Sequence, residues 1–441
     1  MDPSRLTATQ ALQAIKSNKL TVASYVQSLL SRIDSRNNKV KAWAYLNRDL
    51  VLSQARKLDS IPEDQRGPLH GVAIGVKDVI YTKDMPTEHN SPLYKDSLVP
   101  VDAASIAILR AAGAVILGKT TTTEFASTVQ GPETMNPHST DQTGIRTPGG
   151  SSSGSGAAVA DFQVPLSLGT QTGGSTIRPG SFNGIYAFKP TWGVVSREGQ
   201  KVYSLTLDTI GLYGRCAEDL KLLAGVLGVK DDDLPTFKGL TGAKFGLVKS
   251  PAWDQAGKGT LAAMQKAQDL LKAHGATVEE VTLPSEFNNM PDWHAKIMAA
   301  DGRVAFLSEY RTDKAKLQDF LVGHVENIKG YTNKETLAAF DGVASLRPVV
   351  DKVANGYDAL LTPSVPDEAP LGIESTGSAA FNGMWTALHV PVVNIPGFNG
   401  DNGLPIGVSM VAARHRDEHL LAVAEEVGKV FGEEGGWKSG L

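Results

Sequence analysis

The sequence predicts an α/β fold, in which a mixed, mostly parallel β-sheet is covered by helices on both faces. Short apolar runs bounded by polar residues, such as 71–76 (GVAIGV) and 164–168 (VPLSL), are typical of buried strands. Amphipathic helical segments, for example 259–274 and 417–430, lie between such runs. Alternation of this kind favours helices layered on a parallel or mixed sheet.

The first elements can be placed from their boundary signals. Thr7 and Gln10 fit a capping box that begins a helix, and a second helix follows from about Thr21. A strand ends at Lys77. A helix from Asp102 stops at Gly113 and leads into a strand over 114–117. Later strands are expected near 244–250, 276–283, 357–363, 390–396 and 403–411.

The 441-residue length alone would allow two or three domains. However, no internal repeat, low-complexity segment or linker divides the sequence. We therefore expect one domain over residues 1–441, with the mostly helical stretch 284–351 as a cap within it.

Composition narrows the function classes. The net charge is −4 and no basic block is present, which argues against a nucleic-acid or anionic-membrane partner. No apolar run has the length of a membrane span, and the polar N-terminus lacks the apolar core of a signal peptide. With Cys216 as the one cysteine, neither an intrachain disulfide nor a cysteine metal cluster can form. A cytoplasmic enzyme without a metal is expected.

Residues 147–160 (TPGGSSSGSGAAVA) crowd glycine and serine together, as chains do where the backbone must closely approach a phosphate, another strand or a reacting carbonyl. Nearby, residues 113–120 (GAVILGKT) match the phosphate-binding pattern G-x-x-x-x-G-K-[ST]. That site needs a strand before the first glycine and a free loop after it. Here a helix comes first and a strand-like run occupies the loop, so a helix–turn–strand corner with a surface Lys119 is favoured.

A second match lies within the stretch itself. Residues 150–154 (GSSSG) fit the nucleophile elbow G-x-S-x-G, with Ser152 as nucleophile. An elbow needs an apolar strand directly before it. The preceding residues are polar and include Pro148, which disfavours a strand there.

A third match joins motifs along the whole chain. The sequence resembles the amidase signature family of serine hydrolases, over nearly its full length and most weakly from 284 to 351. The motifs that carry the resemblance are HGVAIGVKDVI (70–80), GKTTTTEFA (118–126), TPGGSSSGSGAAVA (147–160), GTQTGGSTIRP (169–179), FKPTWGVVS (188–196) and PVVNIPGFNGDNGLPIGVSMVA (391–412).

The resemblance implies a nucleophile at Ser175, a bridging serine at Ser151 after a cis peptide bond, and a base at Lys77. A hydroxyl is a poor nucleophile until a base takes its proton. Lysine can accept that proton only when it is neutral, and burial favours the neutral form. No metal or organic cofactor is then required.

Further roles follow from the same resemblance. Backbone N–H groups of Thr172, Gly173 and Gly174 would form an oxyanion hole before the nucleophile. Ser153 and Thr170 match positions whose hydroxyls orient the bridging serine. Alternatively, these hydroxyls satisfy local backbone groups.

Arg178 lies three residues after the proposed nucleophile, and this GTQTGGSTIRP form resembles the malonamidase-like branch of the family. In that branch the matching arginine binds a substrate carboxylate, as a guanidinium fork can. A buried ion pair with Asp208 is the alternative.

The implied function is hydrolysis of a C–N bond in a small amide or carbamate through an acyl-enzyme, releasing ammonia or an amine. The alternatives are the catalytic glutaminase subunit of a tRNA-dependent amidotransferase, or a carbamate or aryl-amide hydrolase. A non-catalytic scaffold of this fold would be expected to lack one of the three catalytic residues. The family resemblance also implies a homodimer.

Overall fold

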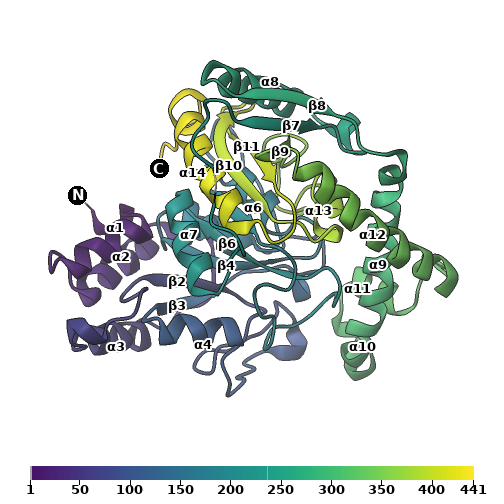
Figure 1. Cartoon of the computed structure of the whole chain (residues 1–441). Helices are drawn as coiled ribbons and strands as arrows, with labels where there is room; N and C mark the ends of the chain where they lie inside the picture. Colours follow the sequence, from purple (N-terminus) through teal and green to yellow (C-terminus); the bar gives the residue numbers. More distant parts are fainter. Residues whose placement is uncertain (1, 236) are drawn as a thin grey trace.

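An eleven-stranded sheet runs through the residues that the computed structural model describes, which are 2–235 and 237–441 (Figure 1). Its strand order is β1-β3-β2-β4-β6-β5-β10-β11-β9-β7-β8. The strands are β1 (Trp43–Tyr45), β2 (Ala73–Lys77), β3 (Val115–Thr120), β4 (Leu166–Gln171), β5 (Tyr186–Lys189), β6 (Thr209–Gly214), β7 (Lys244–Val248), β8 (Thr277–Val281), β9 (Ala359–Pro363), β10 (Val392–Asn399) and β11 (Pro405–Val411).

The mixed sheet is confirmed, but the expectation of a mostly parallel one is wrong. Strand β2 is parallel to β3 and β4, and β7 is parallel to β8 and β9. The other six neighbouring pairs are antiparallel. Only residues 400–404 separate β10 from β11, too few for the crossover that a parallel pair needs.

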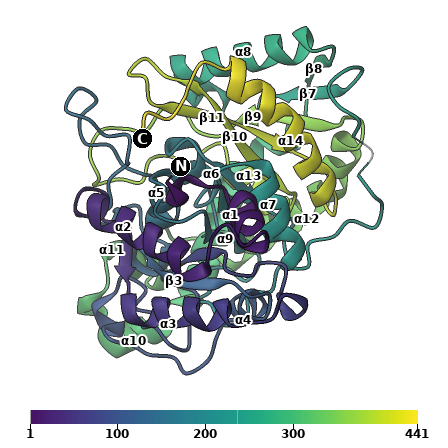
Figure 2. The same cartoon turned by 90° about the vertical axis from the view of Figure 1, so that its left-hand side faces the viewer.

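Helices cover both faces of this sheet, as predicted. One face packs against α4, α7, α8 and α14. The other packs against α2, α3 and α5 at one end and α6, α9, α12 and α13 at the other. Helices α7 and α14 lie side by side in both views (Figure 2). The helices are α1 (Ala8–Lys16), α2 (Val22–Val40), α3 (Arg48–Asp59), α4 (Ala104–Ala111), α5 (Ser153–Ala160), α6 (Ile177–Phe182), α7 (Ala217–Val226), α8 (Lys258–Ala273), α9 (Met290–Ala305), α10 (Leu307–Asp313), α11 (Asp319–Val325), α12 (Asn333–Ala354), α13 (Gly383–Ala387) and α14 (Asp417–Glu434).

The helix starts follow from local chemistry. The hydroxyl of Thr7 accepts the N–H of Gln10, and the Gln10 side chain accepts the N–H of Thr7. This capping box satisfies two N–H groups that the first turn leaves free. Helix α2 begins at Thr21 in the same way, and buries the apolar face expected from its 3.6-residue period.

The stretch 284–351 is helical, and its last helix, α12, continues to Ala354. Helices α9 and α12 pack together over the end of the sheet that holds β9 and β10. Helix α9 also reaches the turn after β4, which is described below. Its role as a cap over a site stays a prediction.

The phosphate-loop match is not a loop. Residues 115–120 form strand β3, so their amides serve the sheet rather than an anion. Lys119 is fully buried rather than on the surface, with its Nζ 3.1 Å from the Asp78 carboxylate and bonded to the Thr87 hydroxyl. The expectation of a surface lysine is therefore wrong.

Within the described chain, no helix combines the length and apolar character needed to cross a membrane. The same residues contain no cluster of three or more His, Cys, Asp or Glu side chains suited to a metal ion.

Candidate active site

Lys77 is the last residue of β2 and is completely buried. The parallel register pairs Val76 with Leu168 of β4, so the carboxyl ends of both strands meet at one edge of the sheet. There the Nζ of Lys77 lies 2.7 Å from the Ser151 hydroxyl and 2.7 Å from the Thr170 hydroxyl. The structure thus brings together the expected base, bridging serine and one supporting hydroxyl.

The electrostatic setting of Lys77 favours its neutral form. Burial lowers the pKa of Lys77 well below its ordinary value, and the nearby Arg178 lowers it further. The negative charge of Asp208 raises the pKa of Lys77 to a smaller extent than burial lowers it. No carboxylate of the described chain forms an ion pair with Lys77. A neutral amine has two N–H donors and one lone pair, so it can donate to Thr170 and accept from Ser151.

Ser151 follows a cis peptide bond to Gly150, just before helix α5. Gly150 is packed closely, since a Cβ there would lie 2.5 Å from the methyl of Thr376. The neighbouring hydroxyls serve the backbone. Ser153 donates to the carbonyl of Gly149 at 2.8 Å, and Ser152 donates to the carbonyl of Thr170 at 3.2 Å. Ser152, the elbow alternative, is fully buried.

Ser175 lies in the turn between β4 and α6 and is 8% exposed. Its hydroxyl makes no hydrogen bond with any part of the chain that the structure describes, including Ser151. The bridging contact between the two serines, which the resemblance implies, is therefore not formed in this structure.

The turn 172–175 presents free backbone N–H groups. None of these four amides donates to an acceptor within residues 2–235 and 237–441. The carbonyls are held instead: that of Thr172 by the Nε2 of His294 at 3.0 Å, and that of Gly173 by the hydroxyl of Thr386 at 2.7 Å. In a trans peptide the N–H points opposite to the C=O. Anchoring these carbonyls therefore aims the amides of Gly173 and Gly174 the other way, as an oxyanion hole requires.

The side chain of Gln171 links the end of this turn to helix α13 by hydrogen bonds. Its Oε1 accepts the N–H groups of Thr176 at 2.8 Å and Ile177 at 3.0 Å, and its Nε2 donates to Thr386 at 3.0 Å. The side chain thereby satisfies the free N–H groups at the start of α6. Gly174 has no room for a side chain, because a Cβ would lie 2.3 Å from Asn382.

Arg178 binds main-chain carbonyls rather than an acid. Its Nε and Nη2 both donate to the carbonyl of Gly150, Nη1 donates to that of Gly377 at 2.7 Å, and Nη2 also contacts the Thr376 hydroxyl. Burial lowers the pKa of Arg178 to about 10. The guanidinium therefore fixes the peptide that precedes Ser151, and most of its N–H groups are occupied.

The suggested Arg178–Asp208 ion pair is wrong. The Asp208 carboxylate instead accepts the hydroxyl of Thr172 at 2.6 Å and the N–H of Tyr203 at 2.8 Å. Burial raises the pKa of Asp208 to about 6. Asp208 thus anchors the first residue of the turn 172–175.

His294 and Thr386 were missed by sequence reasoning. They come from helices α9 and α13, more than 100 residues from the turn that they hold. His294 lies in the stretch where the family resemblance is weakest, and no local motif marks either residue. Only their shared approach to one turn in the folded chain identifies them.

Comparisons with known proteins identify the family of the chain. The model of the Amidase family matches residues 24–421. A glutamyl-tRNA(Gln) amidotransferase subunit from Symbiobacterium thermophilum is 31% identical, with 96% of each chain covered. A crystal structure of an amidase superposes with a TM-score of 0.85 at 27% identity, covering 96% of this chain and 99% of that one.

A further solved chain, from a vestigial protein complex linked to the origins of an s-triazine catabolic enzyme, has a TM-score of 0.85 at 26% identity. It covers 98% of this chain and 99% of its own. The family match spans both strands that meet at Lys77, the serine-rich segment and the turn 172–175. The chain therefore belongs to the Amidase family and is an amidohydrolase.

Proposed function

We propose that the chain hydrolyses the C–N bond of a small amide with Ser175 as nucleophile, Ser151 as proton bridge and Lys77 as base. One observation carries the proposal: a fully buried lysine, without an acidic partner among the described residues, lies 2.7 Å from the Ser151 hydroxyl. A charged amine in that position would be costly, so the lysine is suited to accept protons.

The cycle begins when the Ser175 Oγ attacks the substrate carbonyl carbon. Its proton passes to Ser151, while the Ser151 proton passes to Lys77. The oxyanion accepts hydrogen bonds from the amides of the turn 172–175. The C–N bond then breaks, and the nitrogen leaves with a proton returned from Lys77 through Ser151. Water attacks the acyl-enzyme by the same relay and releases the acid.

Different observations favour two substrate classes, and carbamates and aryl amides stay further alternatives. The GTQTGGSTIRP form supports the small acidic amides of the malonamidase-like branch. The 31% identity to the amidotransferase relative supports the second candidate, a glutaminase that works with further subunits and tRNA. That candidate would bring a nucleic-acid partner, against the expectation from net charge. Its alignment spans 480 positions, so the relative carries segments that this 441-residue chain lacks.

The primary test compares Ser175→Ala with Ser152→Ala in the purified chain. We expect Ser175→Ala to lose covalent labelling by a fluorophosphonate and to lower kcat about a thousandfold or more, because the nucleophile is removed. Ser152→Ala should remain labelled. Labelling that is lost in Ser152→Ala but kept in Ser175→Ala would contradict the proposal. Rapid hydrolysis of malonamate by the chain alone would favour the small-amide candidate. Activity on glutamine that requires co-purifying subunits would favour the glutaminase.

The pH dependence of kcat/KM should report the ionisation of Lys77. Burial lowers the pKa of Lys77, and only the neutral amine accepts a proton. The rate should therefore rise with pH and level off well below pH 10.5, the ordinary lysine value.

Asp208→Asn provides the control for this profile, because burial raises the pKa of Asp208 to about 6 and its ionisation would also make the rate rise with pH. The rise of kcat/KM with pH should persist in Asp208→Asn and disappear from the residual activity of Lys77→Ala. Loss of this rise in Asp208→Asn would assign it to the carboxyl group instead.

Arg178→Lys should slow neutral and anionic substrates alike. Because the guanidinium holds the Gly150 carbonyl, its loss should disturb Ser151 and lower kcat by about tenfold or more. The ratio of kcat/KM for malonamate to that for 3-methylbutanamide, which has nearly the same shape without charge, should stay within about threefold. A loss confined to malonamate would instead identify Arg178 as the substrate-anion site.

His294→Phe should lower kcat by about tenfold to a hundredfold, with a smaller change in KM. The reason is that the Thr172 carbonyl loses its hydrogen-bond donor, so the neighbouring amides are no longer held in the orientation that the oxyanion needs. His294→Gln, which retains an N–H donor, should keep more activity. The partly exposed His274, whose ring contacts Glu434, supplies the control variant His274→Phe. Equal kcat in His294→Phe and His274→Phe would show that the contact does not position the turn.

A further inference from the structure

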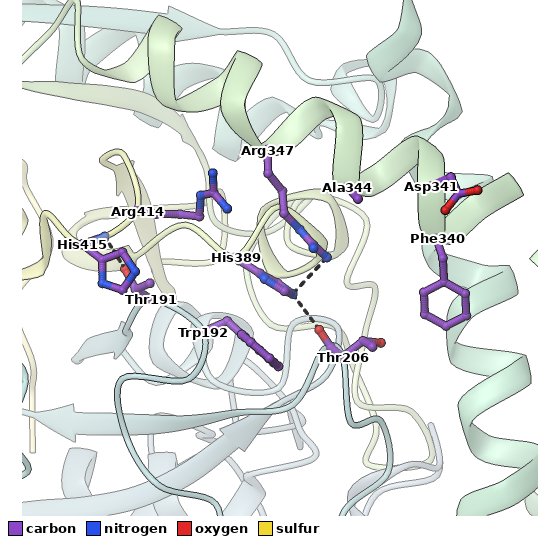
Figure 3. A pocket seen from close by; sticks show the side chains of 10 residues that line it. All are labelled: Thr191, Trp192, Thr206, Phe340, Asp341, Ala344, Arg347, His389, Arg414 and His415. Atoms are coloured by element: carbon purple, nitrogen blue, oxygen red, sulfur yellow. Dashed lines mark hydrogen bonds between the residues drawn. The ribbon is translucent and has the colours of Figure 1, made fainter. Parts of the chain in front are cut away.

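A cavity of about 560 Å³ lies between helix α12 and the loop that follows β5, and none of the proposed catalytic residues lines it. Figure 3 shows its walls: Arg347, Ala344 and Phe340 on α12, Trp192 and Thr206 in the loops after β5, and His389 just beyond α13. Most of the lining surface is apolar, and Arg347 projects across it toward His389. Asp341 also lines the cavity, and in Figure 3 it lies near Phe340, away from Arg347.

Arg347 has no acidic partner among the described residues. Its Nε donates to the carbonyl of Ala387 at 3.2 Å, and its Nη2 lies 3.1 Å from the Nε2 of His389. Arg414, on the same wall, differs: its Nε and Nη2 bind the Asp351 carboxylate at 2.8 and 2.6 Å. Burial and the neighbouring Arg414 lower the pKa of Arg347, as expected for a cation without a counter-charge.

The contact between Arg347 and His389 cannot satisfy both groups. The same Nε2 of His389 lies 2.7 Å from the carbonyl oxygen of Thr206 (Figure 3). A ring nitrogen carries either a proton or a lone pair, so it can serve one of these two neighbours. The shorter contact to a carbonyl requires the proton on Nε2. The N–H of Arg347 that faces it is then left without an acceptor among residues 2–235 and 237–441.

Trp192 lines the cavity beside His389. Its ring stacks on His389 with centroids 4.4 Å apart. The free donor at this cavity is therefore the N–H of Arg347, and an acceptor on a ligand would satisfy it.

We infer that this cavity binds a small organic carboxylate, held by the Arg347 guanidinium, with its apolar body against Phe340 and Trp192. A guanidinium fork fits a carboxylate with two parallel hydrogen bonds. The apolar lining favours an organic body over a bare inorganic anion. The acid released by amide hydrolysis belongs to this chemical class.

The cavity walls connect to the turn 172–175 through two short segments of the chain. Thr206 lies two residues before Asp208, which binds the Thr172 hydroxyl. Ala387, which Arg347 holds, follows Thr386, which binds the Gly173 carbonyl. An occupied cavity should therefore alter kcat without competing with substrate. This effect on the rate rests on the proposed function, whereas the binding itself does not.

Benzoate is the probe, with binding measured by calorimetry on the full chain. We expect saturable binding to the wild type and to Ser175→Ala, and at least about tenfold weaker binding to Arg347→Gln, the usual loss for one charge-assisted contact. The exposed Arg311 supplies the matched control Arg311→Gln, which should bind like the wild type. Benzamide and inorganic phosphate should each bind at least about tenfold more weakly than benzoate.

A second variant guards against misfolding of Arg347→Gln. Ala344 is exposed at the cavity, so Ala344→Trp should fill the space without touching the core and should abolish binding. The inference is overturned if the wild type does not bind benzoate, or if binding survives both variants. It is also overturned if phosphate binds better than benzoate. Purely competitive inhibition of the wild type by benzoate, with calorimetric binding retained in Arg347→Gln, would place the ligand in the active site instead.

Discussion

The burial of the Lys77 amine between two hydroxyls is the constraint on which the rest of the site depends. An uncompensated charge in this interior would be costly, and the described part of the chain provides no carboxylate that pairs with it. The neutral amine is instead accommodated by Ser151 and Thr170. Parallel pairing of β2 with β4 makes this possible, because it brings the ends of both strands to the same edge. A structural requirement, avoiding a buried charge, thereby produces a chemical property, a lysine able to accept a proton.

The turn 172–175 shows a second constraint, because several of its polar groups are held by side chains that are distant in the sequence. His294 of α9, Thr386 of α13 and Asp208 before β6 each bind one group of the turn. Each contact fixes a polar group that would otherwise rotate, and together they leave the amides free. The helices beyond β8 are thus connected to the chemistry even though none of them supplies a proposed catalytic residue.

Sequence reasoning predicted the local features well. The capping box at Thr7, the apolar face of α2 and the approach of Lys77 to Ser151 all depend on residues close in sequence or on specific motifs. It failed where long-range geometry decides. The balance of parallel and antiparallel pairs depends on loop lengths such as 400–404. Arg178 binds carbonyl oxygens, which every residue carries, so no sequence pattern could identify them. Lys119 was misplaced because burial beside Asp78 is a tertiary property.

Arg178 and Arg347 illustrate that the surroundings of an arginine, rather than its residue type, determine what it binds. Arg178 directs its N–H groups at fixed carbonyls, so an incoming carboxylate would have to displace existing hydrogen bonds. Arg347 faces a nitrogen that already serves another group, so a carboxylate there would displace nothing. A buried cation gains most from an anion where its present partners are poorest. By this criterion, the guanidinium better suited to recognise an acid lies outside the catalytic site. It is that of Arg347 on helix α12, which binds the carbonyl of Ala387, the residue after Thr386.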